Sequence, residues 1–465
     1  MAELWRLGGY ELSNLIRSKK VSTVEVVESH LNRLAEVNCK LNAVVQEMPD
    51  EAINDAKEID SKIKSGKNPG VLCGIPVTIK VVADQKGHAT TNGLRLHKDL
   101  IANTDSPIVS NVKKAGGIII GRTNTPAFSL RWFTNNELHG QTLNPHDKSI
   151  TPGGSSGGAS SAVASGMCPI AHGTDIGGSI RYPAYACGLH GLRPTLGRIP
   201  AYNASWPERS IGPQLMAVGG PIARSMKDIE ISFEAMAASD SRDPWYVPAP
   251  INGPNFEKRV AFSTHPDGMP VCEEVVTAIR DSADRLAKLG WKVEEVECPP
   301  MKDVADINAQ LWMAEMRHWA KEAIEKEAEP NSKFVFEQMT KRSPEIGIGG
   351  MLEALQKRAT FLREWQLFLT KYPVLITPVS GQLPFPQQLD VKSENDFENV
   401  MKAQLTQLAV PALGLPALSV FTGFSGTTPL GVQLIGARFR EDILIAAGTD
   451  IEKSGQSPLC VDPSW

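Results

Sequence analysis

The stretch from Thr151 to Arg198 restricts the fold of this chain most, because it is dense in glycine and serine. It reads TPGGSSGGASSAVASGMCPIAHGTDIGGSIRYPAYACGLHGLRPTLGR, with apolar residues throughout, so it is not a low-complexity linker. Gly157 and Gly158 permit close backbone approach, and residues 159–164 are small and compatible with a helix. The segment therefore predicts a loop that opens into a tightly packed helix.

A second glycine pair lies in the run from Asp175 to Ser179, DIGGS. Consecutive glycines before a serine can present several backbone N–H groups to one point, as an oxyanion hole requires. A purely structural turn that packs a helix against a sheet explains the same composition. A phosphate-binding P-loop does not fit, because no lysine follows the glycines, and the strict G-x-S-x-G nucleophile elbow is absent. Spacing alone leaves the oxyanion hole and the structural turn open.

Strand and helix patterns alternate along the rest of the chain. Residues 75–80 alternate like a strand, with Val77 and Ile79 on one side and Lys80 on the other. Further strands are predicted at 118–120, 260–262, 293–296, 374–377, 415–421 and 431–435, and helices at 22–37, 106–115, 273–289, 303–328 and 351–371. The alternation predicts an α/β fold: a single large domain with a central mixed β-sheet covered by helices on both faces. The stretches 200–215 and 239–255 are predicted to be surface segments and not domain linkers.

Composition narrows the function classes. The 465 residues carry a net charge of −4, which argues against a broadly basic nucleic-acid-binding protein. No run of about 18 apolar residues and no apolar signal core occur, so neither a membrane span nor export is predicted. The seven cysteines form no C-x-x-C pair and the histidines show no ligand spacing. These features predict a reduced, cytoplasmic protein without a metal site.

Several motifs together resemble the amidase signature family. They are GIPVTIK at 74–80, GRTN at 121–124, GGSSGG at 153–158, GTDIGGSIRYPA at 173–184, CGLHGLRPTLGR at 187–198, TPV at 377–379 and PLGVQLIG at 429–436. The resemblance covers nearly the whole chain. It implies that residues 1–465 form a single amidase signature domain, with a signature core at about 74–198 and flanking helical and substrate-pocket segments at about 200–370.

The resemblance also implies a catalytic set of Lys80, Ser155 and Ser179. Ser179 would be the nucleophile, Ser155 a bridging serine held by a cis peptide after Gly154, and Lys80 the terminal base. The implied oxyanion hole consists of the backbone N–H groups of Ile176, Gly177, Gly178 and Ser179. Asp175 and Arg181 would support the loop and shape it. Ser129 would touch the substrate.

A lysine can act as this base only when its amine is neutral. Its free pKa of ~10.4 must fall by about 3 units, which corresponds to ~4 kcal/mol. Lys80 ends an apolar strand and is followed by Val81 and Val82, which favours desolvation. Val81 stands where members of the family commonly carry an acidic residue, and Asp84 follows shortly after. A carboxylate of Asp84 close to Lys80 would keep the amine protonated, whereas one that points away would matter little.

Other side chains have competing interpretations. Four aromatic residues are candidates for the wall of an apolar pocket: Trp132, Phe133, Trp206 and Trp312. Trp132 and Phe133 are favoured because they flank family motifs. Cys168 and Cys187 could be nucleophiles of a cysteine amidase. Both lie among small and apolar residues, which predicts buried structural thiols instead.

The function that the resemblance implies is hydrolysis of amide-type C–N bonds through a Ser179 acyl-enzyme, with no metal or organic cofactor. Small-molecule amides, anilides, esters and carbamates (urethanes) would fit the same groups. One alternative is a glutaminase-type subunit of a tRNA-dependent amidotransferase, which would need partner subunits. Another is a catalytically inactive binding scaffold. The expected partner is a small-molecule substrate, with no nucleic acid and no membrane, for a monomer or homodimer.

Overall fold

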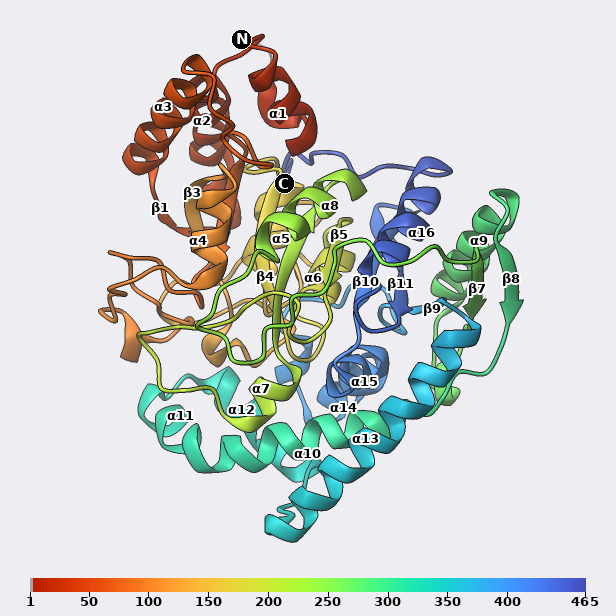
Figure 1. Ribbon diagram of the computed structural model, residues 1–465. Helices are drawn as coiled ribbons and strands as arrows, with labels where there is room; N and C mark the ends of the chain where they lie inside the picture. Colours follow the sequence, from red (N-terminus) through yellow and green to blue (C-terminus); the bar gives the residue numbers. More distant parts are fainter. Residues whose placement is uncertain (1–2) are drawn as a thin grey trace.

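The computed structural model describes residues 3–465 of the chain. Its strands are β1 (Val44–Glu47), β2 (Pro76–Lys80), β3 (Ile118–Thr123), β4 (Ile170–Asp175), β5 (His190–Arg193), β6 (Val218–Ala223), β7 (Arg259–Phe262), β8 (Lys292–Glu295), β9 (Val374–Pro378), β10 (Ala417–Ser425) and β11 (Thr428–Gly436). They join in one 11-stranded sheet in the order β1-β3-β2-β4-β6-β5-β10-β11-β9-β7-β8 (Figure 1). β2 pairs in parallel with β3 and β4, whereas β10 and β11 are antiparallel. The predicted mixed sheet is confirmed.

The helices surround this sheet. They are α1 (Gly9–Arg17), α2 (Thr23–Leu41), α3 (Pro49–Lys64), α4 (Pro107–Lys114), α5 (Gly157–Ala164), α6 (Arg181–Ala186), α7 (Ile211–Met216), α8 (Met226–Met236), α9 (Glu273–Lys288), α10 (Lys302–Trp319), α11 (Lys321–Glu327), α12 (Pro330–Arg342), α13 (Gly347–Lys371), α14 (Glu394–Ala403), α15 (Leu405–Leu413) and α16 (Glu441–Lys453). Short 3₁₀ turns are η1 (Leu4–Arg6), η2 (Arg95–His97), η3 (Ala127–Ser129), η4 (Pro266–Gly268) and η5 (Leu389–Val391). No helix within residues 3–465 is both long and apolar enough to cross a bilayer.

Local sequence signals explain several of these elements. Ser22 begins α2 with a capping box: its Oγ accepts from the Glu25 N–H at 3.1 Å, and the Glu25 carboxylate accepts from the Ser22 N–H at 2.7 Å. The helix predicted over 22–37 extends to Leu41. The helix predicted over 303–328 is two helices, α10 and α11, which meet at Ala320.

Helices cover both faces of the sheet, as the packing of neighbouring strand residues shows. Ile118 and Ile120 of β3 pack with residues of α2 and α5, and Ile119 packs with residues of α4 and α8. On β9, Leu375 packs with α10 and α13, and Ile376 with α9 and α16. Successive strand residues point to opposite faces, so each face carries its own layer of helices.

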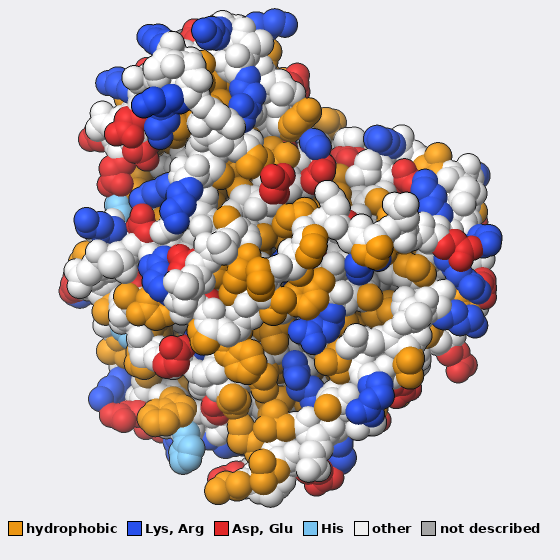
Figure 2. Space-filling model, viewed as in Figure 1, with side chains coloured by type: hydrophobic (Ala, Val, Ile, Leu, Met, Phe, Trp, Pro, Cys, Tyr) orange, Lys and Arg blue, Asp and Glu red, His pale blue; other side chains and the backbone are white. Residues whose placement is uncertain are grey.

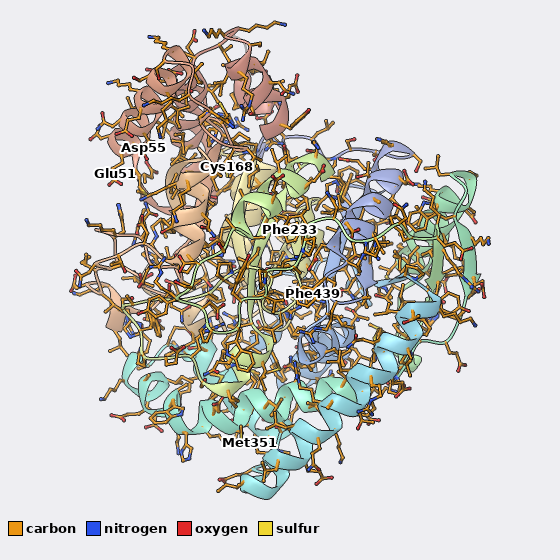
Figure 3. The ribbon with its side chains drawn as sticks, viewed as in Figure 1. Glu51, Asp55, Cys168, Phe233, Met351 and Phe439 are labelled. Carbon is orange, nitrogen blue, oxygen red and sulfur yellow. The ribbon has the colours of Figure 1, made fainter. Side chains whose placement is uncertain are left out.

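Helices α10 to α13 form the lower layer in Figure 1. Figure 3 shows Met351 of α13 in this layer and Phe233 of α8 nearer the centre of the molecule. In Figure 2, hydrophobic side chains gather over α10 and α13. Two of the most exposed are Trp319 (77%) and Ile348 (82%).

The central strands place the glycine-rich segment. β2, β3 and β4 are parallel neighbours, so their carboxyl ends lie at the same edge of the sheet. Lys80 is the last residue of β2 and Asp175 the last residue of β4. Ser155 and Ser156 lie immediately before α5, the tightly packed helix that the sequence predicts. The residues of the family motifs therefore converge at one edge.

Candidate active site

Lys80 is completely buried and is surrounded by hydroxyl groups. Its Nζ lies 2.7 Å from Ser155 Oγ, 2.9 Å from Thr174 Oγ1 and 3.2 Å from Ser156 Oγ. Burial lowers the pKa of Lys80 to about 7, and the Asp175 carboxylate opposes this only in part. A neutral amine has two N–H donors and one lone pair, so three hydroxyl neighbours can satisfy it without a carboxylate. The environment is therefore suited to an uncharged lysine.

The parallel register of the strands explains part of this cluster. β2 and β4 are hydrogen-bonded neighbours, so Thr174, one residue before the end of β4, reaches the end of β2. Ser156 is held in turn by Thr174, whose backbone N–H donates to Ser156 Oγ at 3.2 Å. The Gly154–Ser155 peptide bond is cis. Gly154 is needed here, because a Cβ would lie 2.5 Å from the carbonyl oxygen of Arg131.

Asp84 points away from Lys80. Its carboxylate accepts hydrogen bonds from Thr90 Oγ1 at 2.7 Å and from the Ser205 backbone N–H at 2.9 Å. The Asp84 backbone N–H donates to Asn203 Oδ1. Asp84 thus anchors the 200–215 segment, and its carboxylate makes no contact with the amine of Lys80.

The loop after β4 is built on a buried ion cluster. Arg181 Nε and Nη2 donate to the two Asp175 oxygens at 2.9 and 3.0 Å, and Arg193 Nη1 lies 3.3 Å from Asp175 Oδ1. Burial alone would raise the pKa of Asp175, but the two guanidinium groups outweigh it and hold that pKa well below its usual range. A buried charge is tolerated when it is paired and hydrogen-bonded in this way.

The backbone N–H groups of this loop differ from the prediction in one respect. The Gly178 N–H donates to Asp175 Oδ1 at 2.9 Å, so it is not free to bind an oxyanion. The sequence could not reveal this, because the orientation of a peptide plane depends on its tertiary partners. Within residues 3–465, the N–H groups of Ile176, Gly177 and Ser179 have no hydrogen-bond acceptor.

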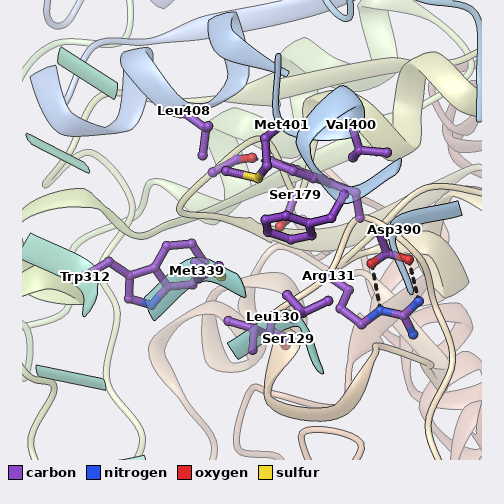
Figure 4. A pocket seen from close by; sticks show the side chains of 14 residues that line it. Ser129, Leu130, Arg131, Ser179, Trp312, Met339, Asp390, Val400, Met401 and Leu408 are labelled. Carbon is purple, nitrogen blue, oxygen red and sulfur yellow. Dashed lines mark hydrogen bonds and ion pairs between the residues drawn. The ribbon is translucent and has the colours of Figure 1, made fainter. Parts of the chain in front are cut away.

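Ser179 lines a partly enclosed cavity (Figure 4). The other lining residues are mostly apolar: Ser129, Leu130, Arg131, Trp132, Gly177, Trp312, Val335, Met339, Asp390, Phe397, Val400, Met401 and Leu408. Ser129 Oγ donates to Asn92 Oδ1 at 2.6 Å. The two charged side chains in this set bind each other, with Arg131 donating to Asp390 at 2.6 and 2.9 Å.

The structure places Ser155 beside Lys80 and Ser179 at the cavity, without a direct bond between them. In the described part of the chain, no hydrogen bond within 3.5 Å joins the two hydroxyls. Ser155 contacts Lys80, and Ser179 faces the cavity. Catalytic hydrogen bonds are often long in the free enzyme and tighten when substrate binds.

The pocket prediction was right for Trp132 and wrong for Phe133. Phe133 is completely buried in an aromatic cluster with Tyr182 and Phe385. Trp206 packs edge-on against His97, at 4.7 Å between ring centroids, and does not line the cavity. Trp312 of α10 does line it. Adjacent residues on an irregular segment face different ways, so the flanking motifs alone could not choose between Trp132 and Phe133.

The two cysteines near the motifs are buried. Burial raises the pKa of Cys168 to about 11 and that of Cys187 to about 12. The thiolate is the nucleophilic form, so both groups are unsuited to nucleophilic catalysis. This agrees with their prediction as structural thiols.

The sequence analysis missed several residues of the site. One of them, Thr174, had a signal, because it lies inside the GTDIGGS motif and could have been chosen as a hydroxyl near Lys80. The cavity walls come in part from α12 and α14, which also expose polar residues, and from α15, whose residues are all buried. The spacing of Phe397, Val400 and Met401 fits one face of α14, but that pattern equally describes a buried core.

Comparison with known proteins adds to this geometry. A family model described as Amidase matches residues 25–445. An indoleacetamide hydrolase of Bradyrhizobium diazoefficiens is 40% identical over 453 residues, which cover 97% of this chain and 86% of that protein. A glutamyl-tRNA(Gln) amidotransferase polypeptide of Clostridium botulinum is 30% identical over 485 residues, which cover 96% of each chain.

Solved structures share the fold. A bacterial aryl acylamidase of the amidase signature family superimposes with a TM-score of 0.84 at 27% identity, over 96% of each chain. A 6-aminohexanoate cyclic dimer hydrolase superimposes with a TM-score of 0.82 at 23% identity, over 98% of each chain.

Proposed function

Because the chain belongs to the amidase signature family and is an amidase acting on amide C–N bonds, we propose that Ser179 is its nucleophile, Ser155 the proton relay and Lys80 the base. The observation that supports this most is the surroundings of Lys80. A buried amine with three hydroxyl neighbours and a pKa of about 7 can take a proton at neutral pH.

The proposed reaction has two steps. Ser179 Oγ attacks the amide carbon while its proton passes to Ser155 and the Ser155 proton passes to Lys80 Nζ. The carbonyl oxygen becomes an oxyanion that accepts from the free N–H groups of Ile176, Gly177 and Ser179. The C–N bond then breaks, the proton on Lys80 returns through Ser155 to the leaving nitrogen, and an acyl-Ser179 ester remains.

Water completes the cycle. It attacks the ester carbon, and its proton follows the same route through Ser155 to Lys80. The Ser179–acyl bond breaks, Ser179 regains a proton through the relay, and the carboxylic acid is released. The direct Ser155–Ser179 hydrogen bond that both steps require would form as substrate fills the cavity and excludes water.

We propose that the acyl part of the substrate is apolar and aromatic, as in an arylacetamide. The cavity beside Ser179 is walled by Trp132, Trp312, Met339 and Leu408. An aromatic group held there would bury a large apolar area and contact aromatic faces. The name of the indoleacetamide hydrolase, 40% identical over nearly the whole chain, fits the same class of substrate.

The seven cysteines are all free thiols, which agrees with a cytoplasmic enzyme.

The test is a substrate panel on the purified protein alone. Indole-3-acetamide and phenylacetamide should release ammonia, with kcat/KM at least a hundredfold above that for acetamide, and Ser179→Ala should abolish release. An anilide, an aryl ester and an aryl carbamate extend the panel to the other kinds of carbonyl group that Ser179 could attack. Equal rates for acetamide and arylacetamides would contradict the apolar pocket, and no covalent label on Ser179 from a sulfonyl fluoride would contradict the nucleophile.

A glutaminase subunit fits the cavity less well. Glutamine carries a carboxylate and an ammonium group, and each would need a partner of opposite charge when buried. The two charged side chains among the described lining residues, Arg131 and Asp390, are paired with each other, and only Arg131 Nη1 is left without a partner. Binding both charged groups of glutamine there would require this ion pair to open. Release of ammonia from glutamine only when partner proteins and tRNA are added would favour the glutaminase role instead.

A further inference from the structure

Three consecutive carbonyl oxygens of the loop after β4 are each held by a different side chain. The Asp175 oxygen accepts from Arg193 Nη1 at 2.6 Å, and the Ile176 oxygen from Asn308 Nδ2 at 3.1 Å. The Gly177 oxygen accepts from Trp132 Nε1 at 2.8 Å. The donors come from β5, from α10 and from the segment after η3. The loop is thus fixed from three remote parts of the chain.

These contacts determine where the N–H groups point. In a planar trans peptide, the C=O of one residue and the N–H of the next point in opposite directions. Asn308, by holding the Ile176 oxygen, therefore directs the Gly177 N–H to the other side of the loop. Trp132 does the same for the Gly177–Gly178 peptide, whose N–H meets Asp175.

Trp132 has a second role that Asn308 lacks. Its ring lines the cavity beside Ser179, while its indole N–H holds the loop. Trp312 also lines the cavity, and a Cβ added to Gly177 would lie 3.6 Å from its ring. In the part of the chain that the structure describes, the Trp312 indole N–H donates no hydrogen bond to the loop. The two tryptophans thus share one wall but not one function.

We propose that Trp132 and Asn308 are positioning residues for the oxyanion-binding N–H groups. Asn308 directs the Gly177 N–H itself, and Trp132 fixes the Gly177–Gly178 peptide that lies between the N–H groups of Gly177 and Ser179. Trp132 also links the aromatic part of the substrate to this arrangement. The inference rests on the proposed role of Ser179. A ring stacked against Trp132 restrains the indole whose N–H fixes the Gly177 carbonyl. Interactions that act only on the transition state raise kcat. Packing of the substrate ring against Trp132 should therefore raise kcat.

The central experiment compares Trp132→Phe with Trp312→Phe. Both keep an aromatic wall, but only the first removes a hydrogen bond to the loop. Trp132→Phe should lower kcat for phenylacetamide by about ten- to a hundredfold with KM within about threefold, because it weakens oxyanion binding indirectly. Trp312→Phe should chiefly change KM. Asn308→Leu should resemble Trp132→Phe, and thermal melting checks that each variant folds.

Two further measurements distinguish the loss of the Trp132 hydrogen bond to the loop from the loss of its ring in the cavity wall. Phenylboronic acid, which forms a tetrahedral adduct with a serine, should bind Trp132→Phe more weakly by the same factor as the loss in kcat. Acylation by p-nitrophenyl acetate, whose acyl group is too small to reach the cavity wall, should also slow about tenfold or more in this variant. Trp312→Phe should weaken boronate binding only by the factor by which it raises KM, and it should slow acetate acylation less than Trp132→Phe does.

The outcomes separate the inference from the proposed function. If Trp132→Phe raises KM like Trp312→Phe and leaves kcat and the acetate acylation rate unchanged, Trp132 is only a wall residue and the inference is wrong. If the wild type hydrolyses the ester but no arylacetamide, the proposed substrate class is wrong, and the acetate acylation rates still decide the role of Trp132. If Ser179→Ala keeps full esterase activity, both fall together.

Discussion

The rate of amide hydrolysis should follow the titration of Lys80, and pH is the cleanest perturbation of that group. A pKa that falls from 10.5 to about 7 corresponds to ~5 kcal/mol in favour of the neutral amine, supplied by burial. With a pKa of about 7, roughly a tenth of the enzyme has a neutral lysine at pH 6 and roughly nine tenths at pH 8. With Lys80 as the proposed base, the active form is the deprotonated one, so activity should be lost as pH falls.

The expected profile is therefore specific. Below pH 7, kcat/KM for an arylacetamide should rise about tenfold per pH unit, and above about pH 8 it should be flat. A lysine with its ordinary pKa of ~10.4 would give a continuing rise up to about pH 10. The assay is ammonia release under kcat/KM conditions from pH 5 to pH 10, with a substrate that does not titrate in this range.

A matched variant tests whether the profile belongs to Lys80. Lys80→Arg keeps a buried cation whose pKa stays too high for it to act as a base. It should lose at least about a thousandfold in kcat/KM at every pH, and no plateau should appear. A plateau at pH 8 in Lys80→Arg, or a wild-type rate that still climbs tenfold between pH 8 and pH 9, would refute the argument that desolvation makes Lys80 the base.

Other consequences follow from the same contacts. Ser179→Ala should lower kcat by more than about 10⁴-fold with an unchanged melting temperature, and Ser155→Ala should cost at least about 10²-fold, both measured by ammonia release. Lys80→Met should raise the free energy of unfolding at pH 7 by about 1–3 kcal/mol in denaturant titrations, because burial of the amine disfavours its charged form. Because the pKa of Lys80 is lowered in the folded state, the gain in unfolding free energy should shrink between pH 7 and about pH 10. A gain that does not change with pH would contradict a neutral buried Lys80. Iodoacetamide at pH 8 should leave activity within about twofold, since the buried thiols of Cys168 and Cys187 have raised pKa values; rapid inactivation, with modification of either residue by peptide mapping, would contradict this.

The sequence reveals the centre of the site better than its walls. Lys80 ends a strand whose alternation is visible locally, and the serines lie in long motifs, so their convergence at one sheet edge follows from parallel pairing. The walls depend on packing between distant helices. Trp312 and Leu408 lie far from the motifs in the chain, and their apolar spacing looks the same whether a helix faces a cavity or a core.

Peptide orientation is a second limit of the sequence. The DIGGS run predicts a loop with several N–H groups, and the structure assigns one of them, that of Gly178, to Asp175. Gly178 has a φ of 97°, and a Cβ there would lie 2.4 Å from Gln407 Oε1, so glycine is required for backbone reasons as well. A glycine pair in a sequence does not tell whether its N–H groups face a substrate or a neighbouring carboxylate.

Asp175 connects the two halves of the proposed chemistry. It is the acidic residue whose charge acts on Lys80, and an unpaired carboxylate at this position would favour the protonated amine. Arg181 and Arg193 bind it instead, so its negative charge is largely compensated where it is buried. The same carboxylate then has oxygens available for the N–H groups of Gly178 and Ile180, which fixes the turn that carries Ser179. The two arginines therefore allow one aspartate to hold the loop that carries Ser179 without preventing Lys80 from losing its proton.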